Sequence, residues 1–286
     1  MTKHLKDFQK NKLVNRLIPI NNELSNSIGS LIGYQDFDFE KFFLGNEKEE
    51  IEPQFKLGQH ILVLGTTGTG KTNFLINFFA HCPHKIIFFN SIGIIEVKKL
   101  SDISLTDETN LRNCLINPKI KKISITPKDE IITSPNALMN LWDRVCKEIY
   151  MYEDLIYTKA MEKKGWKKDE DFNRRADIII VCDELMFVME DEDMTAWHMG
   201  LLTRGRNYKI SHVGASQRNQ NISKKITNNT FHIFILRMNQ YDINALQGKI
   251  KYIEYSDKIK PFHFVYYTAL DNIPSFYKPV PLLMYQ

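Results

Sequence analysis

The sequence has few cysteines, and their spacing argues against two kinds of scaffold. Cys82, Cys114, Cys146 and Cys182 are the only cysteines in 286 residues, and none belongs to a C-x-x-C pair. Structural zinc sites and disulfide frameworks need paired or closely clustered cysteines. We therefore expect free thiols, with neither a structural zinc site nor a disulfide framework.

Long apolar runs and a strong charge of one sign are also missing. No run approaches the ~20 apolar residues of a membrane-spanning helix, and the start MTKHLKDFQKNK lacks the apolar centre of a signal peptide. The net charge of +4 is compatible with nucleic-acid binding but does not require it. Hydrophobic residues at 43% and charged residues at 25% are typical of a soluble globular protein. We expect a cytosolic protein without a membrane span.

The most informative stretch that is present is LGTTGTGKT, residues 64–72. Its spacing is G-x-x-x-x-G-K-T, the Walker A pattern, in which glycines allow backbone amides to converge on phosphate oxygens. The lysine places a charge near the β and γ phosphates, and the threonine hydroxyl ligates Mg²⁺. The residues predicted to bind the nucleotide are Gly65, Thr66, Thr67, Gly68, Thr69, Gly70, Lys71 and Thr72.

The flanking sequence supports this motif. The apolar run at 60–64 predicts a buried strand, and residues 73–80 are apolar on one helical face. A helix that begins at the glycine turn aims its N-terminus at the anion. The alternative is an ordinary glycine- and threonine-rich turn between a strand and a helix.

A second motif ends in two carboxylates. Residues 177–184 read DIIIVCDE, a continuous apolar run typical of a central parallel strand. Asp183 and Glu184 then lie at the carboxyl edge of the sheet, where ligands bind. Asp183 fits the Walker B position, which holds Mg²⁺ together with Thr72, and Glu184 fits a base that polarises the attacking water. The alternative for Glu184 is a role in capping backbone donors of a following helix.

Other apolar runs complete the predicted sheet, namely 85–90, 122–126, 210–217 and 232–236, and residues 135–165 predict a long helix. Gln217 ends one of these strands, so it is expected at the same edge as Asp183. It would contact the attacking water or the γ-phosphate; the alternative is an amide bonded to loop backbone. The basic residues Lys163, Lys164, Lys167, Lys168, Arg174 and Arg175 are expected in a solvated loop, with DNA contact as the alternative.

The order of these motifs resembles the FtsK–HerA superfamily of DNA-pumping ATPases. GTTGTGKT, IIIVCDE, RGRN and a strand that closes in SQR follow one another within residues 58–250. The short length and the G-R-x-x-x-I-S spacing ahead of Gln217 resemble one branch in particular, the poxvirus-type genome-packaging ATPases of large eukaryotic DNA viruses and their virophage relatives.

The resemblance implies an α/β fold, a RecA-like P-loop core with a mainly parallel sheet flanked by helices. It implies a pentameric or hexameric ring that threads double-stranded DNA, with ATP and Mg²⁺ as cofactors. Lys71, Glu184 and Gln217 are the implied catalytic residues of one subunit. Arg206 is the implied arginine finger, which reaches the neighbouring subunit, and Arg204 and Arg218 are its alternatives. Capsid vertex or portal proteins are implied partners, in the host cytoplasm, the viral factory or the virion.

We divide the chain into an N-terminal arm or small subdomain at 1–57, the ATPase core at 58–250, and a C-terminal hairpin and tail at 251–286. An inserted helical region is expected within the core at 92–176. Alternation at 250–255 and 262–268 predicts the hairpin at the sheet edge.

The predicted function is ATP-driven translocation of double-stranded DNA that packages a viral genome into a preformed capsid. One alternative is a P-loop kinase or GTPase, which Glu184 and the lack of an N-K-x-D motif disfavour. The other is a nucleotide-switched assembly, secretion or extrusion protein that does not pump DNA.

Overall fold

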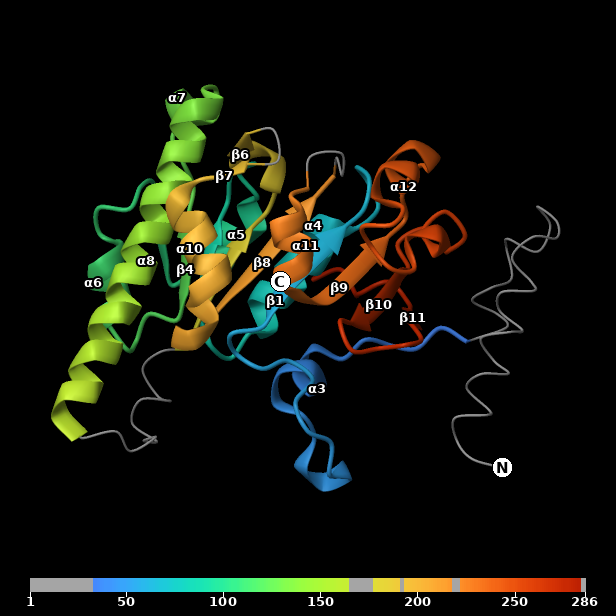
Figure 1. Ribbon diagram of the computed structural model, residues 1–286, viewed down its shortest axis with the longest axis horizontal. Helices are drawn as coiled ribbons and strands as arrows, with labels where there is room; N and C mark the ends of the chain where they lie inside the picture. The colour runs from blue at the N-terminus through green and yellow to red at the C-terminus, as the bar shows by residue number, and fades with distance from the viewer. Residues whose placement is uncertain (1–32, 165–176, 191–192, 218–221, 284–286) are drawn as a thin grey trace.

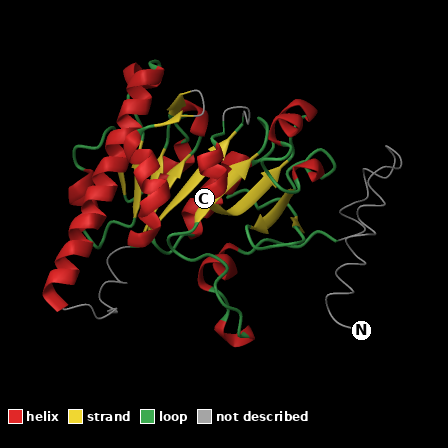
Figure 2. Cartoon of the chain, in the orientation of Figure 1, coloured by secondary structure: helices red, strands yellow, loops and turns green. Residues whose placement is uncertain are grey.

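The computed structural model describes residues 33–164, 177–190, 193–217 and 222–283. A mostly parallel sheet forms the centre of the molecule, and helices cover both of its faces (Figures 1 and 2). The strands lie in the order β11-β10-β9-β1-β8-β5-β2-β4-β3. Their bounds are β1 His60–Leu64, β2 Lys85–Phe89, β3 Ile103–Leu105, β4 Lys122–Ile125, β5 Ile178–Cys182, β8 Ile210–Ser216, β9 Thr230–Leu236, β10 Phe264–Thr268 and β11 Ser275–Tyr277.

Helices follow most of the strands, and a separate short ribbon pairs β6 Met189–Glu190 with β7 Asp193–Met194. The α-helices are α3 Phe39–Leu44, α4 Lys71–His81, α5 Ile95–Leu100, α6 Leu111–Ile116, α7 Asp129–Ile132, α8 Pro135–Lys164, α10 Ala196–Arg204, α11 Lys224–Asn229 and α12 Gln240–Leu246. Single 3-10 turns are η2 Glu47–Glu49, η3 Leu185–Phe187, η4 Gly205–Tyr208 and η6 Ile253–Tyr255. No helix in the described ranges is both long and apolar enough to cross a membrane.

The central strands are those that the apolar runs predict. Every residue of β1, β5 and β8 is buried, as expected for strands covered on both faces. These strands pair in parallel, with β8 lying between β1 and β5. The long helix predicted at 135–165 is present as α8. The predicted fold class is confirmed.

Two apolar clusters form the core, one on each face of the sheet. One contains the buried face of α8, including Leu141, Trp142 and Val145, together with Leu201 and Leu202 of α10. The other contains phenylalanines of α3 and α4, which pack on Ile61, Val63 and Phe234. All four cysteines are buried and free, as the spacing predicts.

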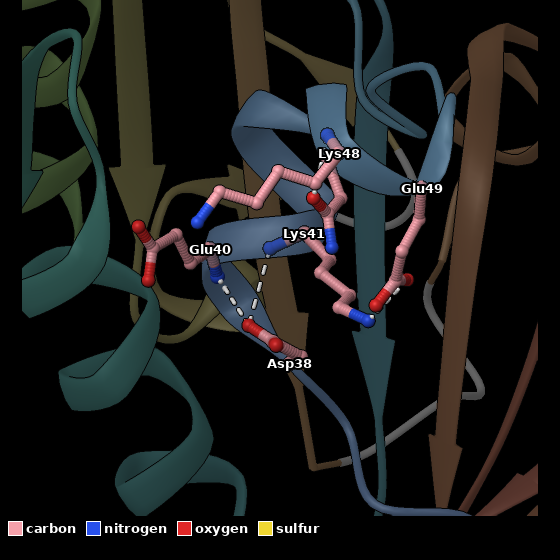
Figure 3. A network of polar contacts seen from close by, with 6 residues as sticks. Asp38, Glu40, Lys41, Lys48 and Glu49 are labelled. Carbon is pink, nitrogen blue, oxygen red and sulfur yellow. Dashed lines mark hydrogen bonds and ion pairs between the residues drawn. The ribbon is translucent and has the colours of Figure 1, made fainter.

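The described part of the N-terminal segment packs onto the second cluster. Phe39, Phe42, Phe43 and Phe55 are buried, and the Phe37 ring lies among aromatic rings of α3, α4 and the β9–β11 edge. The Asp38 carboxylate caps α3 by accepting from the amides of Glu40 and Lys41, and Lys41 pairs with Glu49 (Figure 3). The division of the chain at residue 57 stays a prediction.

A hairpin does close the sheet edge, but one of its predicted strands is wrong. β10 pairs antiparallel with β9 and with β11, so residues 264–268 and 275–277 form the hairpin. Residues 250–255 instead form turns and η6, with Tyr252 in the left-handed region at φ 62°. Ile250, Ile253 and Tyr255 are buried in the first cluster from this irregular segment. The alternating apolar residues of this segment are therefore buried in the core although the segment is not an extended strand.

Candidate nucleotide-binding site

Three adjacent strands end at one point of the sheet. In the register, Leu64 of β1 lies opposite Ser216 of β8, and Cys182 of β5 lies opposite Gly214. The residues that follow these strands are Gly65, Gln217 and Asp183, which therefore gather at one edge. Since β8 lies between the two motif strands, Gln217 is placed between the glycine loop and the carboxylates.

The glycine loop has the backbone that its sequence predicts. Gly68 and Gly70 have φ of 77° and 104°, values that favour glycine. A Cβ on Gly65 would stand 2.7 Å from Thr69 Oγ1 and 2.9 Å from Leu236 Cβ. Gly70 precedes α4 and has no side chain to cap its first amides, so the N-terminus of α4 can receive an anion.

The Lys71 side chain is buried and folds back over the loop. Its ammonium donates to the carbonyl of Gly65 at 2.5 Å and to that of Thr66 at 3.0 Å. Burial lowers the pKa of Lys71 to about 8, and the charges of Glu184 and Asp242 oppose that shift. Phosphate oxygens are stronger acceptors for this ammonium than the two carbonyls.

Gln217 links the loop to Glu184. Its side-chain oxygen accepts from Thr67 Oγ1 at 2.6 Å, and its backbone amide donates to Glu184 Oε1 at 3.1 Å. Neither sequence interpretation foresaw this pair of contacts. The bridge connects the loop that would hold phosphate to the carboxylate that would act as base.

Glu184 is fully buried, and its carboxylate does not cap η3, the turn that follows it. Its Oε2 atom has no hydrogen-bond partner among the described residues. Burial raises the pKa of Glu184 to about 7, although the Gln217 amide and the Lys71 charge lower it. A buried carboxylate oxygen without a donor is an acceptor for the proton of a bound water.

Asp183 is held at the same edge by the chain that follows β2. The Ser91 hydroxyl donates to one carboxylate oxygen, and the Ile92 amide donates to the other at 3.1 Å. Burial raises the pKa of Asp183 to about 6, against the lowering effect of these hydrogen bonds. The carboxylate is thus fixed in orientation before any ligand binds.

Several solved structures resemble this one. The genome-packaging ATPase B204 of Sulfolobus turreted icosahedral virus superposes with a TM-score of 0.56 and 12% identity, over 79% of this chain and 100% of that chain. The plasmid coupling protein TrwB, solved with ADP and Mg²⁺, gives a TM-score of 0.61 and 11% identity, over 93% and 94% of the two chains. The type VII secretion ATPase EccC of Thermomonospora curvata gives 0.52 and 12%, over 92% of this chain and 31% of that chain. No protein-family model matches the chain, and the comparison with curated proteins gives no match.

The chain has a RecA-like P-loop NTPase fold. At these identities the likeness establishes the fold, and the P-loop is the glycine loop at residues 65–70 described above. The fold expected from the FtsK–HerA resemblance is therefore confirmed.

The residues predicted to hold Mg²⁺ have the chemistry that the ion prefers. Thr72 lines the pocket with its side chain exposed, and the buried Asp183 carboxylate lies one residue beyond β5. Hydroxyl and carboxylate oxygens are suitable ligands for Mg²⁺. Within the described ranges, no cluster of three or more His, Cys, Asp or Glu forms another metal site.

The structure separates the predicted arginines from the P-loop of their own chain. Arg204 and Arg206 are exposed and lie just before β8, at the opposite edge of the sheet. β8 has seven residues, so Arg206 is about 20 Å from Gln217. Neither arginine can reach its own nucleotide site. Arg218 and the side chains of the basic cluster at 163–175 lie outside the described residues.

Sequence reasoning missed residues that tertiary structure brings to the pocket. Ser91, in the chain that follows β2, donates to the Asp183 carboxylate, and the charge of Asp242 in α12 raises the pKa of Lys71. Glu96, Phe262, Leu282 and Leu283 line the pocket beside the P-loop. None of these positions belongs to a short motif.

Proposed function

We propose that this protein is an ATP-driven translocase of double-stranded DNA that packages a viral genome into a preformed capsid. The observation that carries the proposal is the connection of P-loop, Gln217 and Glu184 by the hydrogen bonds at 2.6 and 3.1 Å. This arrangement suits hydrolysis, because it sets a water-activating carboxylate beside the phosphate cradle. A kinase transfers the phosphoryl group to a substrate, so it does not need a carboxylate that activates water.

Each residue then has a distinct part in hydrolysis. The P-loop amides and Lys71 bind the phosphates, and Lys71 leaves the Gly65 and Thr66 carbonyls to do so. Glu184 accepts a proton from water as the water oxygen bonds to the γ-phosphorus and the bond to ADP breaks. Mg²⁺, held by Thr72 and Asp183, would neutralise charge on the phosphates. Gln217 reports the state of the γ-phosphate to Thr67 of the loop.

The DNA-moving part of the proposal draws on fold neighbours and on sequence. B204 is a DNA-packaging ATPase and TrwB is a plasmid coupling protein. The superfamily motifs add a pentameric or hexameric ring and an arginine finger from the neighbouring subunit. The same proposal includes capsid vertex or portal proteins as partners. It also includes a location in the host cytoplasm, the viral factory or the virion.

The secretion ATPase EccC shares the fold, so a nucleotide-switched secretion or assembly protein is the competing function. The two functions differ in their response to DNA. A translocase hydrolyses ATP faster on duplex, and its affinity for duplex falls steeply with salt and is insensitive to sequence.

The test is the steady-state ATPase rate of the full chain with and without long linear duplex. We expect duplex of any sequence to raise the rate, and Lys71→Ala to abolish it because the phosphates lose a buried charge. Lys85→Ala is the matched control, since Lys85 donates to the carbonyls of residues 114, 115 and 117, away from the P-loop. A rate that ignores duplex would favour the switch, and full turnover by Lys71→Ala would refute the site.

A further inference from the structure

The last described residues of the chain, Val280–Leu283, run along the helix that follows the P-loop. The side-chain Nδ2 of Asn73 donates to the carbonyls of Val280 and Pro281 at 3.0 and 3.2 Å. The side-chain Nδ2 of Asn77, one turn further along α4, donates to the Pro281 carbonyl at 2.9 Å. These bonds fix the segment, which we call the C-terminal strap, to α4.

The strap forms one wall of the pocket at the P-loop. This pocket has a volume of about 460 Å³, within the range of small-molecule sites. Its polar lining includes Thr67 of the P-loop, Lys71 and Thr72 at the start of α4, and Gln217 directly after β8. Its apolar lining comes mainly from Phe262 and from Leu282 and Leu283 of the strap.

Phe262 and Leu282, which line this pocket, are large apolar residues exposed to solvent. The fractional exposures of the two residues are 53% and 78%. Phe262 also has φ of 63°, an uncommon conformation for an aromatic residue. The Phe262 ring lies against the end of the P-loop, because a Cβ on Gly70 would stand 3.4 Å from its Cδ1. An uncovered ring is thereby held directly beside the phosphate cradle.

We propose that Phe262 and the C-terminal strap form the subsite for the nucleobase of the bound nucleoside triphosphate. A ligand that suits this pocket is anionic at one end and flat and apolar at the other. The base stacks on the Phe262 ring and contacts Leu282 and Leu283, while its phosphates occupy the P-loop. The inference rests on the proposed function for the identity of the ligand, and it adds the residues that bind the base.

Both subsites are attached to one helix. Lys71 and Thr72 of α4 serve the phosphates, and Asn73 and Asn77 of the same helix position the strap. The strap is then part of the nucleotide site, although it lies more than 200 residues from the P-loop in sequence.

The experiment compares the dissociation constants of MgATP and of Mg²⁺–tripolyphosphate by calorimetry on the full chain. Tripolyphosphate has the phosphates without the base. Phe262→Ala and Leu282→Ala should each weaken ATP about tenfold, a typical effect of removing one base-stacking contact. Both variants should leave tripolyphosphate binding unchanged. Tyr241→Ala and Leu270→Ala are matched controls, because these side chains are 69% and 78% exposed and do not line the pocket.

The outcomes separate this inference from the proposed function. Unchanged ATP affinity in both variants, or equal weakening of ATP and tripolyphosphate, would overturn the base subsite and leave the ATPase proposal standing. Tighter ATP binding by Leu282→Ala would mean that the strap obstructs the pocket, which also overturns it. Failure of the wild-type protein to bind either ligand would refute the nucleotide site itself.

Discussion

At the Glu184 carboxyl, the proposed role in hydrolysis conflicts with stability. A base must be ionised, yet this carboxyl is fully buried and one of its oxygens has no partner among the described residues. Burial raises its pKa to about 7, above the ordinary value of 4.5 for a glutamate. The folded protein therefore loses stability as pH rises from about 4.5 to 7, because the unfolded chain releases this proton in that range while the folded carboxyl still holds it. A carboxyl whose pKa is shifted by burial is typical of catalytic positions.

Glu184→Gln should separate the two effects. The glutamine keeps the acceptor for the Gln217 amide but cannot take a proton, so we expect hydrolysis to be lost while ATP still binds. Its free energy of unfolding relative to wild type should rise by about 2–3 kcal/mol between pH 4.5 and pH 8, at about 1.4 kcal/mol per pKa unit. Urea titrations at several pH values measure this difference. Normal turnover, or a pH-independent difference in stability, would contradict the assignment.

Short motifs identified residues that the structure brings together, because the residues of each motif are neighbours in sequence. The structure places Lys71, Asp183 and Gln217 at one edge, as the strand ends predict. Ser91 and Phe262 could not be predicted in this way. They approach the site through the pairing of β2 with β5 and through the turn before β10, which no local pattern specifies.

At the scale of elements, the type of apolar pattern decided which predictions succeeded. The continuous runs of β1 and β5 are buried on both faces and could only be central strands. Alternation at 250–255 was a weaker guide, since a turn and a 3-10 helix bury the same side chains. β3, whose three residues are only half-buried or exposed, gave no comparable signal.

The aromatic segment that contains α3 permits a stability test. Phe42 is 1% exposed and contacts rings of β9 and β10, whereas Leu44 in the same helix is 54% exposed. Phe42→Ala should lower the free energy of unfolding by about 3–5 kcal/mol, and Leu44→Ala should change it by less than about 0.5 kcal/mol. Chemical denaturation measures both values. Similar small effects would mean that this segment is an independent arm, as the division at residue 57 predicts.

At the scale of the whole molecule, the two edges of the sheet carry different chemistry. The candidate nucleotide site lies at the carboxyl edge, and the exposed Arg204 and Arg206 lie at the amino edge. An arginine about 20 Å from its own P-loop cannot act on that site, so a role in hydrolysis would require a second subunit. This placement fits a ring in which the amino edge of one subunit meets the carboxyl edge of the next.

Arg206→Ala should therefore separate binding from hydrolysis. ATP binding should persist, because Lys71 and the loop hold the phosphates, while turnover falls about a thousandfold or more. Mixing this variant with Lys71→Ala should restore activity, since an intact pocket can then receive a working arginine from its neighbour. Absence of rescue, in mixtures shown to exchange subunits, would remove Arg206 from this role and direct the test to Arg204 and Arg218.

The central claim is that hydrolysis moves duplex DNA, and displacement of a third strand measures that movement directly. A labelled triplex-forming strand is placed on a long duplex, and its release is followed after addition of the full chain and ATP. We predict release that requires ATP and a free stretch of duplex, and no release by Glu184→Gln even where that variant binds the DNA. If the wild-type protein hydrolyses ATP in the presence of duplex yet leaves the third strand bound, it is not a translocase.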